Sequence, residues 1–156
     1  MKKVALLLTA ASLMISPAFS DTLINSTIEE YNDLTILSGA SKISSPSVTD
    51  NVTDIQYTFQ LSDSLFIEMT EKDNKIVTFG CICKDETEAG EFLAQCVTGC
   101  YLLSGVSGGY FCYTEVLDQF LQARSDRNSE ARKLPSAGLV MNLTRESFGY
   151  LFLISR

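Results

Sequence analysis

Apolar and polar residues alternate most clearly between residues 54 and 83. Three stretches there, 55–61, 65–70 and 76–83, have apolar side chains at every second position, which is the period of a strand with one buried face. Short polar segments separate them, and Asp73-Asn74 suits the positive φ angles of a tight turn. The pattern predicts an antiparallel meander with one apolar face to cover.

A helical period follows directly. Apolar residues recur at spacings of three and four, which predicts a helix over 86–103 whose apolar stripe covers the meander. The glycine-rich segment 104–109 predicts a break, and a second helix is expected over 114–124. Four acids at the start of the first helix complement the positive end of its dipole: Asp85, Glu86, Glu88 and Glu91.

The segment before the meander predicts one more helix. Ser26 and Glu29 have the spacing of a capping box, so we expect a helix over 27–37 that begins at Ser26. Residues 38–54 are rich in serine, threonine and aspartate, which is typical of an irregular connection or a poor edge strand.

The last part of the chain predicts a hairpin. Residues 124–136 are mostly polar and are expected to form an exposed loop. Residues 138–143 and 148–154 predict two strands, and the second is apolar on both faces, as in a central strand. The expected order is therefore α-β-β-β-α-α-β-β. This is an α+β fold with an antiparallel sheet of about five strands and two or three helices on one face.

Residues 1–20 have the layout of a secretory signal peptide, with two lysines, an apolar run over 4–15 and small residues before a cleavage point after Ser20. The run is shorter than the ~20 residues of a membrane span. The alternative is a buried N-terminal helix. We expect a bacterial protein that is periplasmic or secreted, with residues 21–156 as one compact domain and no membrane span in the mature chain.

Charge is distributed unevenly. The chain has 19 acidic and 12 basic residues, and residues 21–91 hold 14 of the acids but only four lysines. Such a domain should repel nucleic acid, and it should attract a basic partner protein through long-range electrostatics. The alternative is that the charge serves only solubility.

The chain has no histidine. This excludes a Ser-His-Asp triad, a Cys-His dyad and a histidine-containing zinc site. Residues 105–109 match the G-x-S-x-G motif around Ser107, but that nucleophile turn needs a strand before it and a helix directly after it. Here a predicted helix comes first, so we interpret the motif as an ordinary turn. No residue is predicted to be catalytic and no cofactor is expected.

Five cysteines are the most informative residues. In an exported protein disulfides are expected. Cys81 and Cys96 lie at comparable distances from the connection between the last meander strand and the helix, which favours Cys81–Cys96 as the first pair. Cys100–Cys112, across the glycine-rich segment, is the second, which leaves Cys83 as a free thiol. One alternative is a zinc or copper(I) site made of four thiolates. Another is that the cysteines are simply small buried hydrophobic residues.

The candidate partner surface combines the four acids at the helix start with Tyr110 and Tyr113, because tyrosine is enriched at interfaces, although core packing explains tyrosines equally well. The sequence thus favours a non-catalytic module that binds another protein, such as an inhibitor, an immunity protein against a toxin, or an escort. The alternatives are a secreted enzyme that uses carboxylates or a free cysteine, and a cysteine-based metal or redox binder.

Overall fold

The computed structural model describes residues 22–134 and 138–156 of the chain. The predicted signal peptide, residues 1–20, lies outside these ranges. Among the described residues, no helix combines the length and the apolar character needed to cross a bilayer.

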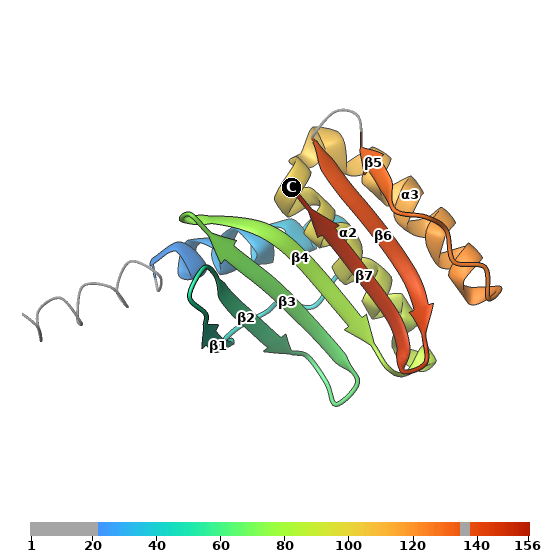
Figure 1. The fold of residues 1–156 in the computed structure, drawn as a ribbon, viewed down its shortest axis with the longest axis horizontal. Helices are drawn as coiled ribbons and strands as arrows, with labels where there is room; N and C mark the ends of the chain where they lie inside the picture. Colours follow the sequence, from blue (N-terminus) through green and yellow to red (C-terminus); the bar gives the residue numbers. More distant parts are fainter. Residues whose placement is uncertain (1–21, 135–137) are drawn as a thin grey trace, which may run out of the picture.

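Seven antiparallel strands form one sheet in the order β1-β2-β3-β4-β7-β6-β5. The strands are β1 (Ser47–Asp50), β2 (Ile55–Gln60), β3 (Leu65–Lys72), β4 (Lys75–Cys83), β5 (Arg132–Leu134), β6 (Leu139–Glu146) and β7 (Gly149–Ser155). Figure 1 views the sheet from its uncovered side, with the helices behind it. β4 is the central strand and pairs with β7, so β7 is an interior strand, as its two apolar faces predicted.

The strand register brings the apolar positions onto one face. Met69 lies opposite Phe79, and Ile67 lies opposite Cys81 across β3 and β4. Cys81 in turn lies opposite Phe152 of β7. All five side chains are fully buried, so the inner face is one continuous apolar surface from β3 to β7.

Three helices cover this face: the N-terminal helix (residues 22–38), α2 (Ala89–Ser104) and α3 (Val106–Arg124). A short 3-10 helix, η1 (Glu86–Glu88), precedes α2. α2 is the middle helix, because it packs on β4 and β7 and also contacts α3, while α3 packs on β6. The N-terminal helix joins the layer through Tyr31, whose hydroxyl donates to the Gln95 carbonyl of α2 at 3.3 Å and whose ring stacks on Phe79 at 5.8 Å.

The α+β fold with helices on one face of an antiparallel sheet is confirmed, but the sheet has two strands more than expected. β1 lies in the segment 38–54, and β5 lies inside the predicted loop 124–136. Both are edge strands of three or four residues, and most of their side chains are exposed. Short exposed edges carry no apolar alternation, which is why an edge strand was only one of two alternatives for residues 38–54 and why β5 was not expected.

The start of the N-terminal helix was wrongly predicted. Helix is already formed at residue 22, and the hydroxyl of Ser26 donates to the Leu23 carbonyl at 2.9 Å within the helix, so Ser26 is not its cap.

The break between α2 and α3 is also shorter than predicted, because Gly105 alone interrupts the helices, with a φ of 75°. The rest of the glycine-rich segment is already the first turn of α3. A Cβ on Gly109 would lie 1.9 Å from the ring of Tyr101, so glycine here lets α3 approach α2 closely.

Candidate functional site

The outer side of the helix layer, facing away from the sheet, carries a groove of about 530 Å³. All three helices contribute to it. We call it the helix-layer groove, and its lining residues are Leu37, Ser38, Gly90, Leu93, Ala94, Val97, Tyr101, Tyr110, Tyr113 and Leu117. Eight of these ten side chains are aliphatic or tyrosine, so the groove offers an apolar surface with a few hydroxyl groups.

Apolar side chains continue beyond the groove. Ile36 is 82% exposed and adjoins Leu37, and Leu121 is 55% exposed one turn after Leu117 on α3. Phe111 is 65% exposed, and its ring lies 6.3 Å from that of Tyr110. Contiguous exposed apolar surface of this kind is typical of an interaction site. The surface extends past the groove, so it suits a macromolecule better than a small ligand.

The groove exists because α2 is apolar on two sides. Phe92 and Cys96 point to the sheet and are fully buried, whereas Leu93 and Val97, one residue further along, line the groove. We expected Leu93 and Val97 to belong to the core stripe, and Val97 is indeed buried while Leu93 is half-buried against the core. A signal for the second side was present, because α2 has no charged residue after Glu91, and a helix that is apolar all round is usually covered on both sides.

Acids outnumber basic residues on the three helices that form the groove. These helices carry six acids and one basic residue, Arg124, and Arg132 of β5 pairs with two of the acids, Glu115 and Asp118. Glu30 and Asp33 are exposed and lie seven and four residues before Leu37, on the same helical stripe as this lining residue. No lysine or arginine occurs between residues 22 and 41. The net charge of the N-terminal helix is therefore negative, which favours a positively charged ligand.

Two of the six residues predicted for a partner surface, Tyr110 and Tyr113, lie together in this groove. The four predicted acids do not line it. Asp85 caps η1 by accepting from the Thr87 amide at 2.9 Å, and this hydrogen bond lowers the pKa of the Asp85 carboxyl. Glu86 forms an ion pair with Arg124 at 3.4 Å.

The other two acids connect neighbouring segments. Glu88 accepts from the Ser62 hydroxyl at 2.9 Å and also from Ser64, which anchors the β2–β3 turn to the start of α2. Glu91 accepts from the Ser41 amide at 2.7 Å and so holds the segment after the N-terminal helix. These carboxylates have local structural partners, whereas Glu30 and Asp33, which the sequence analysis did not select, form no ion pair within the described part of the chain.

All five cysteines are buried free thiols in the structure. Cys81 of β4 neighbours Cys96 of α2, and Cys112 of α3 neighbours Cys100 of α2, because in each case the first thiol raises the pKa of the second. The Cys100 sulfur also lies 4.0 Å from the Met141 sulfur, and the Cys112 sulfur lies 3.6 Å from the Ser104 hydroxyl. Within residues 22–134 and 138–156 no three ligating side chains converge, so the metal site of four thiolates is not formed.

The predicted free thiol, Cys83, lies two residues after Cys81 on the same face of β4, and it donates to the Asp85 carbonyl at 3.1 Å. Burial raises the pKa of Cys83 to about 11, so it is protonated at neutral pH and a poor nucleophile. The hydrogen bond from Cys100 lowers the pKa of Cys112 to about 7, which makes Cys112 the most ionised thiol whose pKa is shifted.

Ser107 lies in the first turn of α3, directly after the break that follows α2. A strand does not precede it, so the strand–turn–helix geometry of a nucleophile elbow is not formed.

Fold and groove together define a small α+β domain whose helix layer carries an apolar groove beside an acidic N-terminal helix. No family model, curated protein or solved structure matches the chain.

Proposed function

We propose that this chain is an exported, non-catalytic protein-binding module, and that its helix-layer groove binds a basic, partly apolar segment of a partner protein. An inhibitor, an immunity protein or an escort would each work in this way. The observation that carries the proposal is the combination of exposed apolar side chains with acids and almost no cations on the same three helices.

The properties of the groove suggest what the partner segment looks like. An amphipathic helix docks by placing apolar residues at spacings of three, four and seven into such a groove. Tyr101, Tyr110 and Tyr113 add hydroxyl groups beside apolar rings, a combination that is common at protein interfaces. Lysine or arginine on the flanks of that helix would face Glu30 and Asp33, and the attraction would speed association.

Catalysis has weaker support. The chain lacks histidine, Cys83 is protonated at neutral pH, and the four predicted acids are engaged in caps, turns and an ion pair. The carboxylates of the helix start therefore have structural partners, and no pair of them faces a common cleft in the described residues.

The test uses residues 21–156 and a fluorescent probe peptide of about 18 residues, or five helical turns, with leucine on one face and lysine on the other. Fluorescence polarisation measures its Kd for the native chain. Leu117→Lys should weaken binding at least about tenfold, because it places a charge in the apolar groove and repels the lysines of the probe. The same peptide with glutamate in place of lysine should bind far more weakly to the native chain.

The matched control is Leu153→Lys. Leu153 is 46% exposed on the uncovered face of the sheet, and Leu117 is 38% exposed in the groove, so both variants add a charge at an exposed leucine. Leu153→Lys should leave the Kd within about twofold of the native value. The proposal fails if both variants weaken binding equally, if the acidic peptide binds as well as the basic one, or if neither peptide binds.

A further inference from the structure

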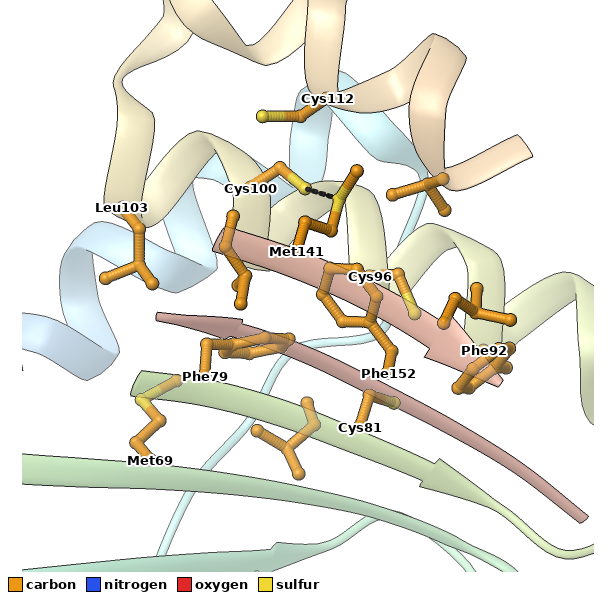
Figure 2. Packing of buried hydrophobic residues seen from close by; sticks show 14 of the residues in the cluster. Met69, Phe79, Cys81, Phe92, Cys96, Cys100, Leu103, Cys112, Met141 and Phe152 are labelled. Atoms are coloured by element: carbon orange, nitrogen blue, oxygen red, sulfur yellow. Dashed lines mark hydrogen bonds between the residues drawn. The ribbon is translucent and has the colours of Figure 1, made fainter. Parts of the chain in front are cut away.

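The four paired cysteines connect different layers of the fold. Figure 2 shows Cys96 pointing from α2 toward Cys81 on the sheet, and Cys112 of α3 lying above Cys100 of α2. In each pair the two thiols are close enough for one to shift the pKa of the other, and Cys100 also contacts the Met141 sulfur at 4.0 Å, the dashed line in Figure 2. Each pair therefore brings together sulfurs from two elements, as a crosslink between those elements requires.

We propose that Cys81–Cys96 and Cys100–Cys112 are disulfide sites, which tie β4 to α2 and α2 to α3, while Cys83 remains a thiol. Cys83 follows Cys81 by two residues on the same face of β4, but its thiol is directed to the Asp85 carbonyl at 3.1 Å. Two disulfides use four of the five cysteines, and the contact with Asp85 makes Cys83 the one that stays unpaired. The inference does not depend on the proposed binding function.

The oxidant is a disulfide, either a small one such as oxidised glutathione or that of an oxidised dithiol protein. The Cys112 thiolate attacks one sulfur of this disulfide, so a mixed disulfide forms and the other sulfur leaves as a thiolate. Cys100 then loses its proton and attacks the Cys112 sulfur, which forms the protein disulfide and releases the second sulfur of the oxidant. Two protein thiols are oxidised, and the oxidant gains the two electrons.

The two sites differ in how readily they react. Cys112 titrates near neutral pH, whereas burial raises the pKa of both Cys96 and Cys100. Cys112 lies about two turns after Gly105, the break between the two helices, and its side chain is 1% exposed. Cys81 and Cys96 lie between the sheet and the middle helix and are also fully buried. Both crosslinks should therefore form while the chain folds, before the helices close over the sulfurs.

The experiment refolds reduced residues 21–156 from urea in a glutathione redox buffer, alkylates the remaining thiols in denaturant and maps the crosslinks by mass spectrometry. Proteolytic cleavage after Lys84 and Tyr101 separates the three groups of cysteines: Cys81 with Cys83, Cys96 with Cys100, and Cys112. We expect a mass lower by four hydrogens than that of the reduced chain, with a single alkylated residue, Cys83.

Paired substitutions assign each crosslink. Cys81→Ala with Cys96→Ala should leave only the link between α2 and α3, and Cys100→Ala with Cys112→Ala should leave only the link between β4 and α2. Cys83→Ala is the control and should retain both. Any crosslink to Cys83, or a native chain that refolds with all five thiols alkylated, overturns the proposal. If a paired variant does not refold, the mapping of the native chain and of Cys83→Ala still decides the outcome.

Discussion

The inner and outer sides of the helix layer are both apolar, but only the inner side is filled. Phe92 on the inner side of α2 is fully buried between the rings of Phe120 and Tyr150, at 6.4 and 6.0 Å. Leu117 on the outer side of α3 is 38% exposed and borders an open groove. The inner residues are explained by folding alone. The most exposed outer residues, such as Tyr110 and Leu117, are not explained by core packing, and this is why we propose that they contact a partner.

The largest expected difference between the two sides is the stability that is lost when a side chain is truncated to alanine. Phe92→Ala should lower the free energy of unfolding by about 3–5 kcal/mol, because it leaves a cavity in the aromatic cluster. Leu117→Ala should lower it by less than about 1 kcal/mol, since its site is already partly solvated. Urea unfolding of both variants measures the contrast. Equal losses would mean that the outer side is part of the core.

Adding a methyl group should also affect the stability of the fold differently on the two sides of α2. A Cβ on Gly99 would lie 2.2 Å from the ring of Phe79, so Gly99→Ala should destabilise the fold by about 1–3 kcal/mol. Gly90 lies on the groove side of the same helix, and a Cβ there meets no atom within 4 Å. Gly90→Ala should therefore stabilise the fold by up to about 1 kcal/mol, through helix propensity. A loss at both positions in urea unfolding would contradict the difference between the sides.

Ionisation at the α2–α3 contact provides a pH test. The pKa of Cys112 falls from its ordinary value of 9.0 to about 7, because Cys100 donates a hydrogen bond to it. The folded state therefore favours the thiolate, and this contribution is present above pH 9 and is lost as the pH falls toward 7. We expect the free energy of unfolding of the reduced protein to be about 1–2 kcal/mol higher at pH 9 than at pH 7.

Cys112→Ala is the reference for this measurement, because it removes the contribution. Cys83 acts in the opposite direction but at higher pH, since its raised pKa costs stability only above about pH 9. A native chain and a Cys112→Ala variant with the same change between pH 7 and 9 would show that the thiolate is not favoured.

The smallest expected effect concerns the charges beside the groove. Replacing Glu30 with glutamine and Asp33 with asparagine should change the free energy of unfolding by less than about 0.5 kcal/mol, because both carboxylates are exposed. The Kd for the lysine-containing probe should weaken about two- to fivefold at low salt, and the difference should shrink at 1 M salt. Glu68→Gln, on the uncovered sheet face, should change neither quantity. An effect of equal size from Glu68→Gln would assign the attraction to net charge alone.

The features that could be predicted are those that depend only on residues close together in the sequence. Asp73 and Asn74 have φ angles of 52° and 61°, as a tight hairpin turn requires. The alternation in β2, β3 and β4 marked their buried faces, and the apolar period marked α2. The end of α2 was expected near the glycine-rich segment. The start of α3 was not, because the close approach of Gly109 to Tyr101 depends on the second helix packing against the first.

The sequence by itself determined the α+β class, the meander, the helix that covers it and the acidic character of the first half. These follow from periodicity, turn residues and charge, which are properties of short segments. Only the tertiary structure decided that Leu93 and Val97 line a groove together with Leu37 of the N-terminal helix and with residues of α3. The physical reason is that a helix which is apolar on two sides does not specify which side faces the sheet. The placement of the N-terminal helix and α3 beside α2 settles that choice.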